Sequence, residues 1–227
     1  MFKRGEKKLI MKKGLKKVLS VLVVGALMVT SIVGFSVTSF AASDSSEDSV
    51  SASSSYRVFN VGSEWELRSA LIYANSGDYI QLYNDIRVSG SLYVNKSVTI
   101  NLNYHSIKFE SSSDGLVINS GYLNCVYLWN GRVHADVDSN AAVSVQSGDL
   151  SVYNCSIYAG DSKYYRSYKG GNALYCNSSL SRIWLDYVYL QGGNGYSYSS
   201  RAGKAIYSYS PVYSIGSGYT FFDGKCI

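Results

Sequence analysis

The sequence NALYCNSSLSRIWLDYVYLQGGNG, residues 172–195, carries an apolar side chain at nearly every second position and then ends in glycines. A period of two is typical of a β-strand, because successive side chains of a strand point to opposite faces. The glycines offer no hairpin partner for such a strand. Its partner therefore has to be sought elsewhere in the chain, among segments with the same pattern.

Five segments share one template, which reads apolar, any, apolar, any, turn-type residue, any, any, apolar, any, and a mostly small residue. They are INLNYHSIKF from residue 100, VYLWNGRVHA from 126, LSVYNCSIYA from 150, IWLDYVYLQG from 183 and, more weakly, YSIGSGYTFF from 213. A second template runs in register with the first, as GLVINS from 115, AVSVQS from 142, ALYCNS from 173 and AIYSYS from 205. Two strand templates that recur together indicate a repeating coil.

The repeat predicts an all-β fold, a single-stranded parallel β-helix of about five to six turns. The strand from Ile183 should then pair with the segments from Leu150 and Tyr213, one turn below and one turn above. Inward positions should stack in two columns, namely Ile100, Val126, Leu150 and Ile183, and Leu102, Leu128, Val152 and Leu185.

Residues that alternate with these columns are expected on the outside. Trp129, Trp184 and many of the 22 tyrosines occupy such positions. Asn130 and Asn154 fall at one bend, where asparagine tolerates unusual backbone dihedrals and caps the turn.

A helix is predicted to cover the N-terminal end of the stack. Ser63 and Glu66 have the spacing of a capping box. Leu67, Ala70, Leu71 and Ala74 form one apolar stripe, and Asn75–Gly77 ends the helix. No equivalent cover is recognisable at the other end, where GKCI follows the last, weak segment. Two possibilities stay open there: these residues fold over the top, or the chain is the N-terminal part of a longer protein.

The first 41 residues are predicted to be a secretory signal peptide. A Lys- and Arg-rich stretch, residues 1–17, precedes an apolar run, residues 18–35, and a short small-residue end. Ser39 and Ala41 occupy the −3 and −1 positions of a cut before Ala42. An uncleaved anchor is the alternative, since about 20 apolar residues span a bilayer. The small-residue end favours cleavage, so the protein is expected to be secreted, or associated with the cell surface.

Removal of residues 1–41 changes the charge balance. They hold eight of the 21 Lys and Arg and one of the 16 Asp and Glu, which leaves 13 basic and 15 acidic residues and a net charge of −2. The formal charge of +5 belongs to the export signal, and this argues against a nucleic-acid partner. Residues 42–55 are rich in Ser and acidic groups and should form a disordered linker. Residues 56–227 should form one domain, a monomer without a transmembrane span.

The run from SEWELRSAL at residue 63 through YIQLYNDIRVSGSLYVNKSVTINLNYHSIKF, residues 79–109, carries a family resemblance. It resembles the opening of secreted bacterial right-handed parallel β-helix proteins of the pectin-lyase-like superfamily, which includes many adhesin-like surface proteins. The resemblance covers roughly residues 58–224 and implies a right-handed coil with an N-terminal capping helix. It implies little about activity, because one architecture hosts many functions.

Enzymes of that superfamily carry motifs that can be sought. Polygalacturonase-like hydrolases have Asn-Thr-Asp, Asp-Asp, Gly-His-Gly and Arg-Ile-Lys clusters, whose Asp groups supply the paired carboxylates of glycoside hydrolysis. None of the four occurs, and neither His105 nor His134 is flanked by glycines. Pectate lyases hold calcium with acidic residues and abstract a proton with Arg or Lys, and Pro211 has no Arg nearby to complete their Arg-x-Pro-type motif. A hydrolase is disfavoured, and a small calcium-assisted uronate lyase stays open.

The strongest candidate site lies in the loops between the two templates, above all GDSKYYRSYKGGN and GGNGYSYSSRAGK in successive turns. Aromatic faces stack on sugar rings, while Lys and Arg meet carboxylates or phosphates. The candidate ligand-binding residues, here called the loop patch, are Tyr164, Tyr165, Arg166, Tyr168, Lys169, Tyr196, Tyr198, Arg201 and Lys204, with Lys163 beside them. The alternative is a solvated glycine-rich loop pair without a ligand.

Acidic residues recur at the corner beneath these loops. Oxygen ligands stacked turn by turn are suited to calcium. The candidate Ca²⁺ ligands are Glu110, Asp136, Asp138 and Asp161, and Asn194 continues their column. The alternative is that they are ordinary turn-forming residues.

The four cysteines are Cys125, Cys155, Cys176 and Cys226. They contain no Cys-x-x-Cys pair, which argues against a structural zinc site, and their even number permits two disulfides. Cys176 occupies an inward position equivalent to Val145 and Ser208, which favours a buried free thiol there. The state of the other three stays open.

Two functions of different class follow. The first is an exported, adhesin-like or glycan-binding protein without catalysis, whose partner is an extracellular or cell-wall polysaccharide or a host surface. The second is a polysaccharide lyase that uses a Lys or Arg of the loop patch and Ca²⁺ on the acidic column. The missing hydrolase motifs and the tyrosine-rich outer faces favour the first.

Overall fold

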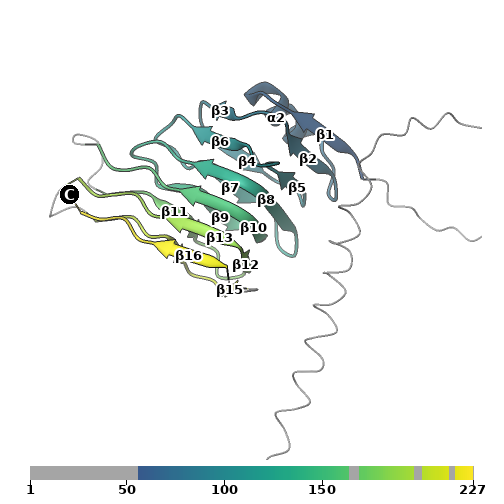
Figure 1. Cartoon of the computed structure of the whole chain (residues 1–227). Helices are drawn as coiled ribbons and strands as arrows, with labels where there is room; N and C mark the ends of the chain where they lie inside the picture. Colours follow the sequence, from purple (N-terminus) through teal and green to yellow (C-terminus); the bar gives the residue numbers. More distant parts are fainter. Residues whose placement is uncertain (1–55, 164–168, 197–200, 215–217, 227) are drawn as a thin grey trace, which may run out of the picture. The chain divides into compact units, whose positions relative to one another are not determined.

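The structure, a computed structural model, describes residues 56–163, 169–196, 201–214 and 218–226 (Figure 1). These residues belong to one compact unit, which is all-β apart from one helix. The predicted signal peptide, residues 1–41, and the predicted linker, residues 42–55, lie outside the described residues. The part of the chain that the structure describes contains no helix with the length and apolar character needed to span a bilayer.

The strands lie in two sheets, and all pairings between the described strands are parallel. The larger sheet has the order β1 (Val58–Val61), β2 (Tyr79–Leu82), β5 (Thr99–Asn101), β8 (Cys125–His134), β10 (Asp149–Tyr158), β12 (Ile183–Asp186) and β15 (Val212–Ser214). It also holds β3 (Ile86–Val88), β6 (Ser106–Phe109), β13 (Val188–Gln191) and β16 (Tyr219–Phe222). The smaller sheet has the order β14 (Ile206–Ser208), β11 (Asn172–Cys176), β9 (Ala141–Ser147), β7 (Leu116–Asn119) and β4 (Leu92–Val94).

The strand from Ile183 finds its partners in other repeats and not in a hairpin. Ile183 lies opposite Leu150 on one side and Val212 on the other. From β4 onward the chain passes alternately through the smaller and the larger sheet. The second template keeps its predicted register at Leu174, which lies opposite both Val143 and Ile206. Between β7 and β9 the register shifts by one residue after Ile118, so that Asn119 lies opposite Ser147 and not Gln146 as predicted.

The predicted register of the first template is wrong at two places. Ile100 lies opposite Leu128 and not Val126, although Ile107 lies opposite Val133 as predicted. Seven positions separate Ile100 from Ile107, against five between Leu128 and Val133, so the bend of this repeat holds two more residues.

Those extra residues have an identifiable conformation. Asn103 and Tyr104 both adopt left-handed backbone, with φ of 48° and 66°. Leu102, just before them, is fully buried and fills the space beside Gly131, where a Cβ would collide with the Leu102 side chain. Strict alternation therefore breaks at this bend, and Leu102 leaves the column that the sequence assigned to it.

The last repeat shows the second error. Ile183 lies opposite Val212, so Tyr213 faces Trp184 instead. Leu190 lies opposite Phe221. Nine positions separate Val212 from Phe221, against seven between Ile183 and Leu190, and the longer connection shifts the register.

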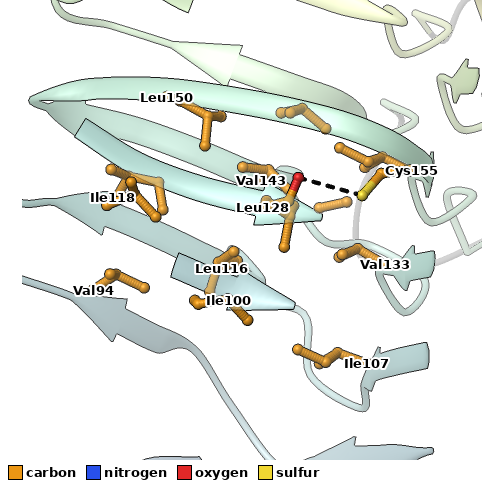
Figure 2. Packing of buried hydrophobic residues seen from close by; sticks show 14 of the residues in the cluster. Val94, Ile100, Ile107, Leu116, Ile118, Leu128, Val133, Val143, Leu150 and Cys155 are labelled. Carbon is orange, nitrogen blue, oxygen red and sulfur yellow. Dashed lines mark hydrogen bonds between the residues drawn. The ribbon is translucent and has the colours of Figure 1, made fainter. Parts of the chain in front are cut away.

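The core lies between the two sheets. One column runs through Ile80, Ile100, Leu128, Val152 and Leu185, which pair in sequence and are all buried. Side chains of the smaller sheet belong to the same buried cluster as this column, and Figure 2 labels Leu128 of β8 and Val143 of β9 among them. Burial of such continuous apolar columns is what holds the repeats in register.

The predicted helix is α2 (Glu64–Tyr73), and its capping box is confirmed. Ser63 Oγ accepts the backbone N–H of Glu66 at 3.3 Å, and Glu66 Oε2 accepts the N–H of Gly62 at 2.8 Å. Leu67, Ala70 and Ala74 are buried in the core cluster, and Leu71 packs against it. The helix contacts β1, β3 and β4 and so covers this end of the sheets.

The opposite end has a different character. Val212 and Phe221 stand at inward positions of the last repeat, yet 36% and 40% of their surfaces are exposed. Cys226 forms a parallel bridge with Gly195 of the preceding repeat. The described C-terminal residues therefore pair with the preceding repeat as further parallel strands.

Candidate functional site

The structure describes part of the loop patch. Tyr164, Tyr165, Arg166, Tyr168 and Tyr198 lie outside the described residues. Lys169 and Arg201 form a parallel β-bridge, so the returning ends of the two loops lie side by side. Lys204 is exposed, and its Nζ lies 2.7 Å from Asp223 Oδ2. Tyr196 is also exposed.

A ladder of glycines closes the base of these loops. The N–H of Gly171 donates to the carbonyl of Gly160, that of Gly193 to Gly171, that of Gly203 to Gly193 and that of Gly224 to Gly203, all at 2.9–3.0 Å. A Cβ on Gly193 would lie far inside van der Waals distance of the Gly160 carbonyl oxygen. The glycines that end the stretch at residues 172–195 are therefore needed for backbone to meet backbone.

The candidate calcium ligands fall into two groups. Glu110, Asp136 and Asp138 line one open hollow of about 460 Å³, together with Lys163, whereas Asp161 does not line it. Glu110 pairs with Arg87. Asp138 Oδ1 accepts the N–H of Lys163 at 2.7 Å, and Asp161 Oδ1 accepts the N–H of Asn194 at 2.6 Å. Within the described ranges, no three His, Cys, Asp or Glu side chains are grouped closely enough to hold a metal ion.

The bend at Asn130 and Asn154 is confirmed and is more elaborate than predicted. Both residues have left-handed backbone, with φ of 55° and 51°. Asn154 Nδ2 donates to Asn130 Oδ1 at 3.1 Å, and Asn130 Nδ2 donates to Asn101 Oδ1 at 3.2 Å. Three amide side chains thus form a hydrogen-bonded ladder that runs across β5, β8 and β10.

Aromatic side chains cover the outer face of the larger sheet before and at this bend. Tyr79 and Tyr127 each meet Trp129 edge-to-face, with centroids 6.2 and 6.0 Å apart, and Tyr153 meets Tyr187 in the same way at 6.0 Å. We call this set of five the upstream aromatic surface. In an edge-to-face pair, the ring that presents its edge keeps both faces clear of its partner.

A second aromatic set lies after the bend and is packed differently. His134 and Tyr158 stack with centroids 4.6 Å apart and planes at 5°, and Tyr158, Tyr189 and Phe222 continue the column at 5.4 and 5.6 Å. Flat stacking covers the facing surfaces of the His134 and Tyr158 rings. This column is therefore suited to stabilising the sheet, whereas the upstream aromatic surface is better suited to contacting a ligand.

The stacked His134 makes stability depend on pH. Burial, together with the charges of Arg132 and Lys108, lowers the pKa of His134 below its usual value of 6.5. The unfolded chain then binds the proton more readily, so the stabilisation is complete above the unfolded pKa and is lost as pH falls through the folded pKa. Phenylalanine stacks but does not titrate. We therefore expect the Tm of His134→Phe minus that of the wild type to increase as the pH falls from roughly 8 to roughly 5. A constant difference in Tm across that range would contradict this assignment.

Cys125, Cys155 and Cys176 are free thiols in the structure. Cys176 is buried opposite Val145 and Ser208, as predicted, and its Sγ lies 3.1 Å from Ser210 Oγ. Burial raises the pKa of Cys125 to about 11 and that of Cys155 to about 12, so neither thiol is poised for nucleophilic chemistry.

Sequence reasoning missed Tyr187. It occupies the turn-type position of its template, yet it has left-handed backbone with φ of 50° and is 55% exposed. The sequence signal that could have identified Tyr187 is a bulky aromatic residue at the turn position where the two preceding repeats carry Asn130 and Asn154.

The pectin-lyase-like resemblance rests on the residues quoted above and is compatible with two sheets of parallel strands. Comparison of the chain with models of protein families, with curated proteins and with solved structures found no match in any of the three.

Proposed function

We propose that this chain is an extracellular, adhesin-like protein without catalysis that binds a glycan on the outside of a right-handed parallel β-helix. Alternation of the chain between two parallel sheets, with each strand beside its equivalents in neighbouring repeats, supports the coil. The order of basic, apolar and small residues in residues 1–41 supports export.

The upstream aromatic surface carries the proposal. Tyr127, Tyr153 and Tyr187 are exposed on the outer face of one sheet, and their edge-to-face contacts fix the rings without stacking them face on face. Rings held in this way lose little further conformational entropy when a ligand binds, which favours affinity. Sugar rings present apolar C–H faces to such aromatic surfaces, and their hydroxyls meet the polar groups between them.

A glycan array probed with the purified protein tests the proposal. We expect binding to at least one linear glycan, and we expect Tyr127→Ala to weaken it about tenfold, which corresponds to about 1.4 kcal/mol. Tyr93→Ala is the matched control, because Tyr93 is an exposed tyrosine on β4 of the other sheet and should leave affinity unchanged. Absence of binding across the array would refute the proposal.

One observation keeps a uronate lyase as the second candidate. Glu110, Asp136 and Asp138 line one open hollow with Lys163, and calcium-assisted elimination uses carboxylates and a base, although these three carboxylates are not grouped closely enough to hold a metal ion by themselves. Incubation with polygalacturonate and Ca²⁺, followed by the ultraviolet absorbance of unsaturated products, separates the two functions. We expect no product. Product that disappears in Lys163→Ala would replace the binding function by the lyase.

A further inference from the structure

Tyr187 is held in a conformation that its side chain disfavours. Its φ of 50° lies in the left-handed region, which bulky residues rarely occupy and which costs free energy unless the surroundings compensate. The register places Tyr187 beside Asn154, because Tyr153 lies opposite Asp186 and Ser156 opposite Tyr189. Asparagine tolerates this conformation, and an asparagine here would extend the amide ladder. The Tyr187 ring does pack against Gly218 of the next repeat, but the backbone conformation at this position gives no reason for a tyrosine.

The amide ladder ends at Asn154, beside Tyr187, and its last group is a hydrogen-bond acceptor. The backbone N–H of Asn103 donates to Asn101 Oδ1 at 3.0 Å, which fixes that atom as an oxygen and sets the direction of the whole ladder. Each following Nδ2 donates to the preceding Oδ1. Asn154 Oδ1 is then the last acceptor, it belongs to an exposed residue, and no described residue donates to it where the next asparagine would stand.

Asp186, which lies opposite Tyr153 in the register, carries a second acceptor without a donor. Asp186 Oδ1 is buried and has no hydrogen-bond partner among the described residues. Burial also raises the pKa of Asp186. A ligand that brings a hydroxyl donor to the exposed Asn154 Oδ1 suits this environment, whereas a ligand carboxylate would lie near the Asp186 carboxylate and be repelled.

The aromatic rings complete the arrangement. Tyr153 and Tyr187 are 43% and 55% exposed, and their planes are at 78°. The two rings thus stand edge-to-face beside the Asn154 amide, and they offer apolar surface next to a hydrogen-bond acceptor.

We propose that Tyr153, Asn154 and Tyr187 form a subsite for one pyranose ring of a neutral glycan, with the sugar face on Tyr187 and a hydroxyl donating to Asn154 Oδ1. This subsite rests on the proposed glycan-binding function and narrows its ligand to hydroxyl-rich, uncharged sugars. It differs in place and in charge from the loop patch with its lysines and arginines.

Tyr187→Asn tests both parts of the inference at once. We expect its Tm to rise by about 2–4 °C, because the strain is relieved and the ladder gains a member. We expect its affinity to fall at least about tenfold, since the aromatic surface is lost. The probes are end-labelled hexasaccharides of a β-glucan, a β-mannan, a chitin-type polymer and polygalacturonate, titrated by fluorescence anisotropy.

Two variants act as controls. Tyr104→Asn makes the same change at a tyrosine that also has left-handed backbone and is 76% exposed, and it should gain stability while keeping affinity. Tyr187→Phe keeps the ring and should also keep affinity.

The outcomes separate the inference from the function on which it rests. A wild type that binds a neutral hexasaccharide, with Tyr187→Asn equally tight, refutes the subsite and leaves glycan binding intact. Preference for the polygalacturonate hexasaccharide refutes the neutral ligand. A lower Tm for Tyr187→Asn refutes the strain argument. A wild type that binds none of the four, and no glycan of the array, refutes the function and the subsite together.

Discussion

Gly193→Ala is expected to destabilise the protein by about 3 kcal/mol or more, because the new methyl group meets backbone that has no room to move. The carbonyl of Gly160 occupies the space that the Cβ needs, and Gly193 is hydrogen-bonded on both sides, to Gly171 and to Gly203. A shift that accommodates the methyl group therefore breaks at least part of the ladder. Urea denaturation followed by circular dichroism measures the loss.

Gly77→Ala separates this clash from the general effect of replacing glycine. Gly77 has φ of 92°, and no atom lies within 4 Å of the place that a Cβ would take, so only backbone strain is added there. We expect a loss of about 1 kcal/mol at this site. Equal losses at Gly77 and Gly193 would show that close backbone packing contributes nothing to the ladder.

Leu128→Ala is expected to lose about 3 kcal/mol of unfolding free energy, because a fully buried side chain in the middle of a stacked column leaves a cavity. The neighbours Ile100 and Val152 lie on adjacent strands in register with it (Figure 2 labels Ile100 and Leu128), and both are themselves buried. Chemical denaturation at equilibrium measures the change.

A double-mutant cycle makes this prediction a test of register. Ile100→Ala and Leu128→Ala should show a coupling energy of roughly 0.5–3 kcal/mol, as residues in contact do. Ile100→Ala and Val126→Ala form the control cycle and should couple much less, because Ile100 lies opposite Leu128, two residues further along β8 than Val126. Stronger coupling in the control cycle would contradict the observed register and support the one predicted from alternation, in which Ile100 lies opposite Val126.

The sequence predicts the strand partners wherever both templates keep their length. Leu174, Val143 and Ile206 align by simple comparison, and the structure pairs them in that way. The error at Ile100 arose because Leu102 continues the period-two pattern into a bend where the backbone no longer alternates. Periodicity reports which residues are apolar, and it does not report where two additional left-handed residues change the path of the chain.

In the candidate site, too, the sequence predicts which residues face outward but not the detailed conformation of their side chains. Alternation correctly places Tyr127 and Tyr153 outside, since every second residue of a half-buried strand faces solvent. Whether such rings stack flat or meet edge-on depends on side-chain rotamers and on neighbouring strands, and no pattern in one sequence encodes that. Tyr187 was missed for a related reason, because its significance lies in a backbone dihedral and in the amide that it fails to extend.

The glycine ladder allows the loop sequences to vary without loss of the hydrogen bonds at their base. Each bond that closes the base of the loops joins one main chain to another, so none of them depends on the identity of a loop side chain. Sequence changes between Asp161 and Gly170 are thus insulated from the packing of Leu128 and its neighbours. The loops are natural positions for grafting foreign peptides, and selection can alter their chemistry rapidly while the scaffold beneath stays the same.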